Sequence, residues 1–412
     1  MRHSSRVVRS VALSVASATF IVTGTAVASS AQAATPSSVA PSRVGVSGRH
    51  PQVGHPQVGD RTGGAAAGRG TPVVPPSGVW SRVPRAVGRL TASDAAAAAE
   101  WIRSAQLPDG AIATFPDQEH LRPNVGNQAA QGLADYARRT GDSDALDAAW
   151  AQLRWYASHE DADGVVTDYD LDADGNMVST GDLDSTSGYA GTFLAAVESA
   201  YHATPVRQRA ARLAEIEPGI DGALRAIAAV TRPDGLTWTK PSWKVVYLMR
   251  QAETYAGLDS AAHLLRALGR PRDGVAAAKA ADRIVSAVDG LWNPETGSYD
   301  WAVHESGFTQ TTDWDNLYSD GIANIWAVAY GLVPAKRAAA LMATVTQRFP
   351  QLLDPTQAGY WPEAAVAYRQ VNNRAQAALV LGGITSLVTE TDHSWPYTPE
   401  TAGVCLTDRL SD

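Results

Sequence analysis

Two short acidic segments each lie directly before a predicted helix and contain carboxylates that could take part in catalysis. Asp182 and Asp184 stand in the first segment, and Asp313 and Asp315 stand in the second. Hydrolysis of a glycosidic bond requires one protonated and one ionised carboxyl group on opposite sides of the scissile bond. The sequence therefore indicates Asp184 with Asp315 as the preferred catalytic pair, and Asp182 and Asp313 as close alternatives.

A purely structural explanation of these carboxylates stays open. Asp and Ser directly before a helix are common N-caps, because their side chains accept hydrogen bonds from the first backbone N–H groups. This explanation fits Asp320 best and fits Asp184 well. Glu253 and Glu363 follow loops that contain Tyr or Trp, and they are lower-ranked catalytic candidates.

The helix predicted after Asp184 carries an apolar face and two early glycines. Its aromatic and apolar residues recur at about one per turn: Tyr189, Phe193, Val197 and Tyr201. Gly188 and Gly191 lie in the first turns, where glycine lowers helix stability. We therefore expect another backbone or a ligand to approach closely at this helix entrance.

Tryptophan is concentrated in the predicted loops, which usually disfavour large apolar side chains. The apolar face of a pyranose stacks on an indole ring, so this distribution favours a sugar ligand. The alternative is that the rings pack over the ends of helices. Trp238 and Trp243 are the strongest case, because Lys240 between them adds a hydrogen-bond donor. The candidate substrate-binding residues are Tyr189, Trp238, Lys240, Trp243, Trp314, Tyr318 and Trp361.

One acidic stretch resembles the first half of a calcium-binding loop. Asp170, Asp172 and Asp174 precede Gly175 at the spacing of such a loop, but Gly181 occupies the twelfth position, where a bidentate Glu is expected. A solvated acidic hairpin is the favoured interpretation. We expect no cofactor, and calcium at these three aspartates is the alternative.

The N-terminal residues predict export. Residues 1–33 combine three arginines, an apolar run and Ala31-Gln-Ala33, which has the small-x-small form of a signal-peptidase site. Residues 34–85 are rich in Pro, Gly, Ser and Val and lack apolar periodicity, which is typical of a disordered linker. We expect a secreted protein with a catalytic domain over residues 86–395 and a C-terminal tail over 396–412.

Charge and cysteine content narrow the range of partners. Removing residues 1–33 leaves 31 basic residues (34 − 3) against 42 acidic ones, a formal charge of −11. Nucleic acid and anionic membranes are poor partners for such a surface, and no stretch after the signal is long and apolar enough to span a bilayer. The single cysteine, Cys405, cannot form an intramolecular disulfide. We expect a monomer whose partner is a carbohydrate.

Helices separated by Asp-Gly turns dominate the chain after Arg85. The predicted helices are Thr91–Gln106, Gly126–Thr140, Asp142–Ser158, Ser185–Ala203, Arg209–Thr231, Val245–Gly269, Asp273–Asp289, Asp320–Gly331, Ala335–Arg348 and Asn372–Glu390. A turn followed by a short strand-like run recurs after alternate helices, which indicates repeated helical hairpins. We predict an all-α fold, an (α/α) toroid of about five to six helical hairpins, with an open solenoid as the alternative.

Three segments together resemble the six-hairpin (α/α) toroid glycosidase superfamily: Trp101–Gly110, Asp184–Phe193 and Asp234–Trp238. The resemblance covers roughly residues 91 to 390 and does not identify a particular family. It implies an (α/α) barrel with a groove lined by carboxylates and, in many members, an inverting acid/base pair.

The leading interpretation is a secreted glycoside hydrolase that acts on a polysaccharide or an oligosaccharide. A polysaccharide lyase on a similar toroid is the second interpretation, but it needs a Tyr or His base and basic residues that are few here. A relative of the terpene cyclases is disfavoured by export and by an incomplete aspartate motif. A non-catalytic carbohydrate-binding envelope protein remains the alternative that is not an enzyme.

Overall fold

The computed structural model describes residues 90–116, 120–357, 359–394 and 396–411. Every described residue belongs to one compact unit, Gly78–Asp412. The predicted signal segment 1–33 and linker 34–85 lie outside the described residues. No helix among the described residues has the length and apolar character needed to cross a membrane.

The described residues form twelve α-helices. In chain order they are α1 (Ala92–Ser104), α2 (Pro123–Thr140), α3 (Ser143–Ser158), α4 (Thr186–Ala203), α5 (Val206–Val230), α6 (Leu248–Ala267), α7 (Pro271–Asp289), α8 (Ile322–Ala329), α9 (Ala335–Arg348), α10 (Pro362–Gln370), α11 (Arg374–Thr391) and α12 (Pro399–Leu406). A π-helical turn, η1 (Leu317–Gly321), leads into α8, and a 3₁₀ turn, η2 (Pro350–Leu353), follows α9.

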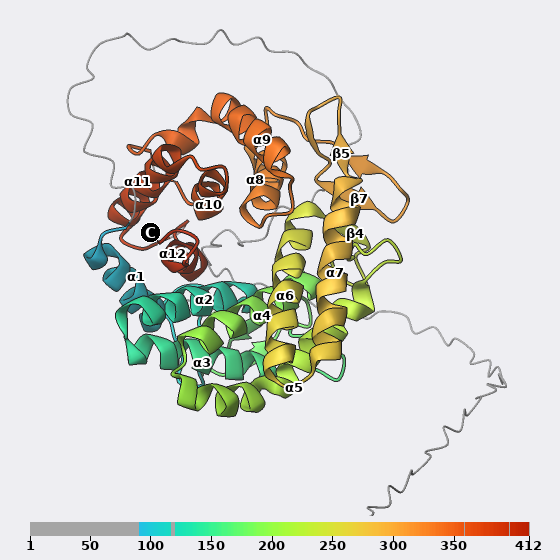
Figure 1. The fold of residues 1–412 in the computed structure, drawn as a ribbon. Coiled ribbons are helices and arrows are strands. Elements are labelled where there is room, and N and C mark those ends of the chain that lie inside the picture. The colour runs from blue at the N-terminus through green and yellow to red at the C-terminus, as the bar shows by residue number, and fades with distance from the viewer. Residues whose placement is uncertain (1–89, 117–119, 358, 395, 412) are drawn as a thin grey trace, which may run out of the picture. The chain divides into compact units, whose positions relative to one another are not determined.

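The helices form two concentric rings. Each even-numbered helix packs against the next even-numbered helix along the chain, and α12 packs against α2, so the inner ring closes. Odd-numbered helices form the outer ring, and each packs against a neighbouring inner helix (Figure 1). The prediction of an all-α toroid is therefore confirmed, and six helical hairpins complete it. Closure through α12 excludes the open solenoid.

The inner helix α4 and the outer helix α7 differ in how much of their surface is buried. The inner helix α4 is buried on all sides over most of its length, because helices α2, α3, α5 and α6 surround it. The outer helix α7 instead buries a single stripe, Ala277, Ala281, Ile284 and Val288, spaced three or four residues apart. The inner helix α4 is thus apolar and buried all round, whereas the outer helix α7 is amphipathic.

The close approach expected near the start of α4 is confirmed. A Cβ atom built on Gly191 would lie 2.4 Å from the carbonyl oxygen of Glu253, and one built on Gly257 would lie 2.4 Å from the Cα of Gly191. A Cβ on Gly188 would lie 2.5 Å from Oε2 of Glu253. The glycines therefore let helices α4 and α6 pack with their backbones in contact.

All ten predicted helices are present, but three parts of the prediction need correction. Residues 245–247 form a strand, and the helix begins only at Leu248. The short inner helix α10 (Pro362–Gln370) was not predicted. The predicted tail 396–412 contains α12 (Pro399–Leu406), which is buried against α2 and closes the ring. Both missed helices are shorter than three turns, so their packing stabilises them more than their own propensity does.

Short antiparallel sheets occupy the loops that enter the inner helices. The strands are β1 (His120–Leu121), β2 (Tyr169–Leu171), β3 (Met177–Ser179), β4 (Val245–Tyr247), β5 (Trp292–Asn293), β6 (Ser298–Tyr299), β7 (Ala302–His304) and β8 (Thr309–Gln310). They pair in the orders β1-β2-β3, β4-β7-β8 and β5-β6. β1 precedes α2, β2 and β3 precede α4, β4 precedes α6, and β5 to β8 precede α8. The strands therefore lie at the end of the barrel where these inner helices begin.

Candidate active site

The predicted acidic residues lie at the end of the barrel where the inner helices begin, called the rim below. Asp184 directly precedes the N-cap Ser185 of α4, and Asp320 lies in η1 just before α8. Backbone N–H groups and the positive end of each helix dipole point toward this rim. Six parallel inner helices therefore direct carboxylates from distant parts of the sequence to one end of the molecule.

Asp184 forms an ion pair with Arg250 of α6, and its side chain keeps 35% of its surface exposed. A second nitrogen of the same guanidinium donates to Oε2 of Glu253 at 2.7 Å. Arg250 is 7% exposed as a side chain and Glu253 is fully buried. Arg250 therefore connects one accessible carboxylate at the rim with one buried carboxylate in the core.

Tyr189 holds the backbone at Asp184 in place. Its hydroxyl accepts a hydrogen bond from the Asp184 N–H at 3.2 Å and donates one to Oδ1 of Asp168 at 2.6 Å. Burial raises the pKa of Asp168 to about 6, and the Tyr189 hydrogen bond opposes this increase. Tyr189 is only 1% exposed. Tyr189, which was predicted to contact substrate, thus lies in the core and holds the loop that carries Asp184 through a hydrogen bond.

Lys240 fixes the other side of this loop. Its ammonium group pairs with Asp182 and donates to the carbonyl oxygen of Leu183 at 2.8 Å. The Lys240 hydrogen bond holds the pKa of Asp182 below its usual value. Lys240 therefore contacts the two residues before Asp184, and Asp182 is already engaged by a cation at the surface.

Two further glutamates enter the site from the helices that the sequence did not predict. Glu400, near the start of α12, is half-buried and accepts a hydrogen bond from Nε2 of Gln128 at 2.6 Å. Burial raises the pKa of Glu400 to about 7; the charge of Glu253 raises it further, while Arg250 lowers it. Glu363 of α10 is 4% exposed, and burial raises its pKa to about 8, reinforced by the charge of Glu400.

The second predicted acidic segment has a different environment. Asp320 is buried and accepts hydrogen bonds from the Asp313 N–H at 2.8 Å and from the Asn316 amide at 2.6 Å. Asp313 in turn accepts from the Asp315 N–H at 2.9 Å. The Asp315 side chain is 86% exposed and pairs with Arg348 of the outer helix α9 at 3.3 Å. Residues 313–320 are therefore held together by hydrogen bonds before α8. The side chain of Asp315 contacts a helix of the outer ring.

Aromatic rings gather around the ion pair of Asp184 and Arg250. Tyr318 stacks on Trp361 with centroids 5.6 Å apart. Burial raises the pKa of Tyr318, and the nearby charges of Arg250 and Asp184 act on the same hydroxyl. Tyr247 is influenced by both charges in the same way. Tyr318 and Trp361, both candidates for substrate binding, thus stack on each other near this charged pair.

Three further aromatic residues were predicted to bind substrate: Trp238, Trp314 and Trp243. Trp238 is partly buried beneath the guanidinium of Arg232, 4.4 Å from its ring centroid. Trp314 donates from its indole to the carbonyl oxygen of Thr296 at 3.1 Å. Trp243 keeps 41% of its surface exposed. Of these three, only Trp243 presents a large exposed ring.

Sequence reasoning missed several residues of this site. Tyr247 ends strand β4 and Arg250 lies in the first turn of α6, and nothing in the local sequence marks either as a site residue. Tyr360 was not among the predicted substrate-binding residues, although the centroids of its ring and the Trp361 ring lie 4.6 Å apart. Glu400 was assigned to the tail. One signal was present: Thr398-Pro-Glu400 has a cap, a proline at the first position and an acid in the first turn, which is typical of a helix start.

No group of three or more His, Cys, Asp or Glu side chains among the described residues is arranged to hold a metal ion. In the stretch considered for calcium, Oδ1 of Asp172 accepts hydrogen bonds from the backbone N–H of Asp174 at 2.9 Å and of Asn176 at 2.8 Å. Asp170 contacts Nδ1 of His120 at 2.5 Å. These contacts describe a tight acidic hairpin between β2 and β3.

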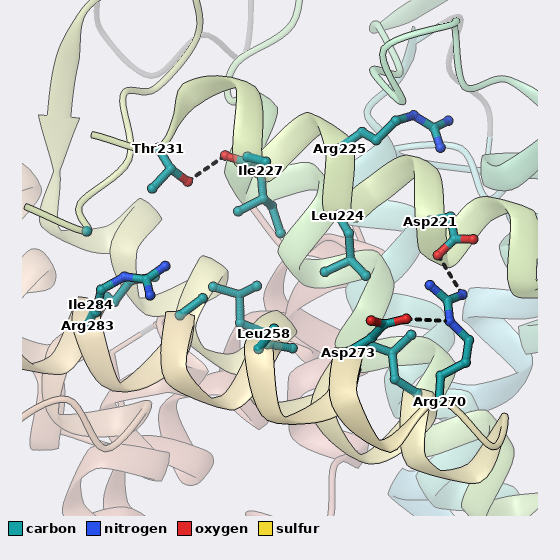
Figure 2. A pocket seen from close by; sticks show the side chains of 16 residues that line it. Asp221, Leu224, Arg225, Ile227, Thr231, Leu258, Arg270, Asp273, Arg283 and Ile284 are labelled. Carbon is teal, nitrogen blue, oxygen red and sulfur yellow. Dashed lines mark hydrogen bonds and ion pairs between the residues drawn. The ribbon is translucent and has the colours of Figure 1, made fainter. Parts of the chain in front are cut away.

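A cavity of about 700 Å³ lies away from the rim, between the outer helices α5 and α7 (Figure 2). Leu258 of α6 lies among the apolar lining residues, and Arg270 closes one end by pairing with Asp221 at 2.8 Å and Asp273 at 2.9 Å. Both aspartates pair with the same guanidinium, and their side chains are 39% (Asp221) and 54% (Asp273) exposed.

No protein-family model and no curated protein matches the chain. Solved structures do match its fold. A GH63 mannosylglycerate hydrolase from Thermus thermophilus, in complex with glucose, superposes with a TM-score of 0.57 at 12% identity, over 76% of this chain and 98% of that one.

Two further solved structures are similar. A wild-type glycosidase has a TM-score of 0.52 at 18% identity, over 77% of this chain and 95% of the other. A rhamnosidase from Klebsiella oxytoca with rhamnose bound has a TM-score of 0.52 at 15% identity, over 77% and 64% of the two chains. At these identities the likeness establishes the fold alone, which is an (α/α) toroid.

Proposed function

We propose that this protein is a secreted glycoside hydrolase that acts on an oligosaccharide or a polysaccharide with inversion at the anomeric carbon. The observation that carries the proposal is the accessible carboxylate of Asp184, held by Arg250 at the rim among the rings of Tyr318, Tyr247 and Trp361. The names of the structural neighbours, which are glycosidases, support the same reaction class. The signal-like residues 1–33 support export.

Glu400 is the proposed partner of Asp184, in place of Asp315. Both Asp184 and Glu400 are partly exposed at the starts of inner helices, and the charge of Arg250 acts on both. A pKa of about 7 suits a group that exchanges a proton near neutrality. Asp315 instead pairs with Arg348 of the outer ring.

The proposed reaction is a single displacement. One carboxylate takes a proton from water while the water oxygen attacks the anomeric carbon, and the other carboxyl group gives its proton to the glycosidic oxygen as the bond to that oxygen breaks. The aromatic rings orient the sugar. The ion pair with Arg250 fixes Asp184, because a guanidinium holds a carboxylate in a defined geometry.

The first test measures reducing-end release by the mature protein over a panel of bacterial and plant glycans and aryl glycosides. We expect Asp184→Asn and Glu400→Gln each to lower kcat by roughly 10²- to 10⁴-fold. Glu100→Gln, at a carboxylate that is 72% exposed on α1, serves as the control and should match the wild type. Asp315→Asn tests the alternative pair. If it abolishes turnover and Glu400→Gln does not, the assignment of Glu400 is wrong.

Aryl glycosides also separate the two roles. A very acidic phenol leaves without protonation, so the variant that recovers activity on such a substrate has lost the general acid, and the other has lost the base. Anomeric configuration of the first-formed product, followed by NMR, tests inversion. Unsaturated products that absorb in the ultraviolet would identify a lyase, and binding without turnover would identify a carbohydrate-binding protein.

A further inference from the structure

Trp243 is a large exposed aromatic residue beside the rim. The residue keeps 41% of its surface exposed, although tryptophan is highly buried on average. It ends the turn Lys240–Trp243, whose two end residues exchange backbone hydrogen bonds of 3.0 and 3.4 Å. The turn therefore presents the indole on a defined backbone.

This turn is fastened to the loop that carries Asp184. Lys240 pairs with Asp182 and donates to the carbonyl oxygen of Leu183, so its side chain joins the turn to the two residues that precede Asp184. Lys240 is only 16% exposed as a side chain. Lys240 thus fixes the position of Trp243 relative to Asp184, because its backbone bonds Trp243 and its side chain bonds Asp182 and Leu183.

A hydrogen bond connects Trp243 to the aromatic group around Asp184. The indole Nε1 donates to the hydroxyl of Tyr247 at 3.2 Å. The Tyr247 ring stacks on Trp301, with centroids 6.0 Å apart and an angle of 8° between the planes. The charges of Asp184 and Arg250 act on the same Tyr247 hydroxyl. Tyr247 therefore lies between Trp243 and the ion pair of Asp184 and Arg250.

We propose that Trp243 is a binding platform for a second sugar residue, so that the substrate at Asp184 is an oligosaccharide whose next sugar stacks on the exposed indole. The inference rests on the proposed glycosidase function and adds the residue that binds the second sugar of the substrate. A pyranose presents an apolar face that matches an indole, and an indole fixed by Tyr247 loses little freedom when the sugar binds. Rings further inside bind the sugar at the scissile bond, and Trp243 selects for chain length.

The test compares substrates of different length. Manno- and gluco-oligosaccharides of two to five residues, and the corresponding p-nitrophenyl monoglycosides, are assayed with the wild type, Trp243→Ala and Trp243→Phe. We expect Trp243→Ala to lower the ratio of kcat/KM for a tetrasaccharide to that for the monoglycoside by about tenfold, as the loss of one stacking contact predicts. Trp243→Phe keeps a ring and should retain most of the ratio.

The phenylalanine variant also separates stacking from support of Tyr247. Both variants lose the indole N–H that donates to Tyr247, so equal losses in both would show that Trp243 acts only through that hydrogen bond. Phe308→Ala is the matched control, since Phe308 is 62% exposed in the turn before β8, two strands away from β4. It should leave the ratio unchanged. An unchanged ratio in Trp243→Ala would overturn the proposal.

Binding to the Asp184→Asn variant distinguishes this inference from the function on which it rests. Calorimetry with the same oligosaccharides should show weaker binding, by about tenfold, when Trp243→Ala is added to Asp184→Asn. If the wild type hydrolyses glycosides but Trp243→Ala binds them equally well, the platform is wrong and the hydrolase stands. If oligosaccharides bind through Trp243 but no glycan is cleaved, the hydrolase is wrong and the platform stands.

Discussion

Arg250 contacts two carboxylates that differ in exposure. Asp184 is 35% exposed as a side chain, whereas Glu253 is completely buried, and one carboxylate oxygen of Glu253 has no hydrogen-bond partner within the described residues. Burial raises the pKa of Glu253, and the charge and hydrogen bond of Arg250 lower it. Arg250 therefore opposes the effect of burial on Glu253, while it also orients the group proposed for catalysis.

Removal of Arg250 should cost more than removal of the whole pair. Arg250→Met leaves Glu253 buried without its partner, which typically costs about 3–5 kcal/mol of unfolding free energy, measured by urea denaturation. The loss should be larger at pH 8 than at pH 5, since protonation relieves the uncompensated charge.

The matched variant is Arg250→Met with Glu253→Met, which removes both buried charges. We expect it to recover most of the stability, because replacing a buried pair by apolar residues is often neutral. Turnover should stay low in both variants, since Asp184 has lost its orienting partner. A double variant as unstable as the single one would show that Glu253 is not the source of the cost.

At the scale of elements, the α4–α6 contact positions the site. Glu253, Arg250 and Gly257 lie on α6, and Gly191 of α4 packs against the backbone at Glu253. The sequence indicated this close approach from the glycines alone. It could not identify the partner helix, because any backbone could fill the space that a missing Cβ leaves.

Gly191→Ala tests this contact. In an ordinary helix the change would stabilise by roughly 0.5–1 kcal/mol. Here the added Cβ would lie 2.4 Å from a backbone oxygen of α6, so the helices must separate. We expect a net loss of about 1–3 kcal/mol in urea denaturation and a reduced kcat, because Arg250 moves with α6. A gain in stability would show that α4 and α6 have room to adjust.

At the scale of the whole molecule, two glutamates removed from water have raised pKa values: Glu363 on the inner helix α10, and Glu160 after the outer helix α3. Glu363 is 4% exposed with a pKa of about 8, and Glu160 is half-buried with a pKa of about 8, in both cases raised chiefly by burial. A carboxyl group whose pKa is higher in the folded protein is protonated there while the unfolded chain ionises. Its contribution to stability is therefore present below about pH 4.5 and is lost as pH rises toward 8.

Glu363→Gln should remove one part of this pH dependence. At pH 5 the variant and the wild type should unfold at similar temperatures. By pH 9 the variant should be the more stable protein, by an amount on the order of a few kcal/mol, because the wild type has lost the stability linked to the protonated Glu363. Scanning calorimetry at both pH values measures this, with Glu100→Gln as an exposed control. A difference independent of pH would contradict the assignment.

The sequence by itself determined which segments are helices, where most of them end, and that Asp184 stands at a helix entrance. These features depend on local interactions: apolar periodicity, caps, and glycines within one or two turns. The ten helices with strong local signals were all present. The two missed helices, α10 and α12, are too short for local signals to specify them.

Only the tertiary structure decided which side chains meet at the rim. Asp184 and Arg250 are 66 residues apart in sequence, and Gln128 and Glu400 are 272 apart. No local pattern encodes such contacts, because they exist only after the ring closes and α12 packs on α2. The same closure buries Tyr189 and leaves Asp315 at the surface. Local interactions along the chain specified most of the helices, whereas packing between distant segments brought the residues of the site together.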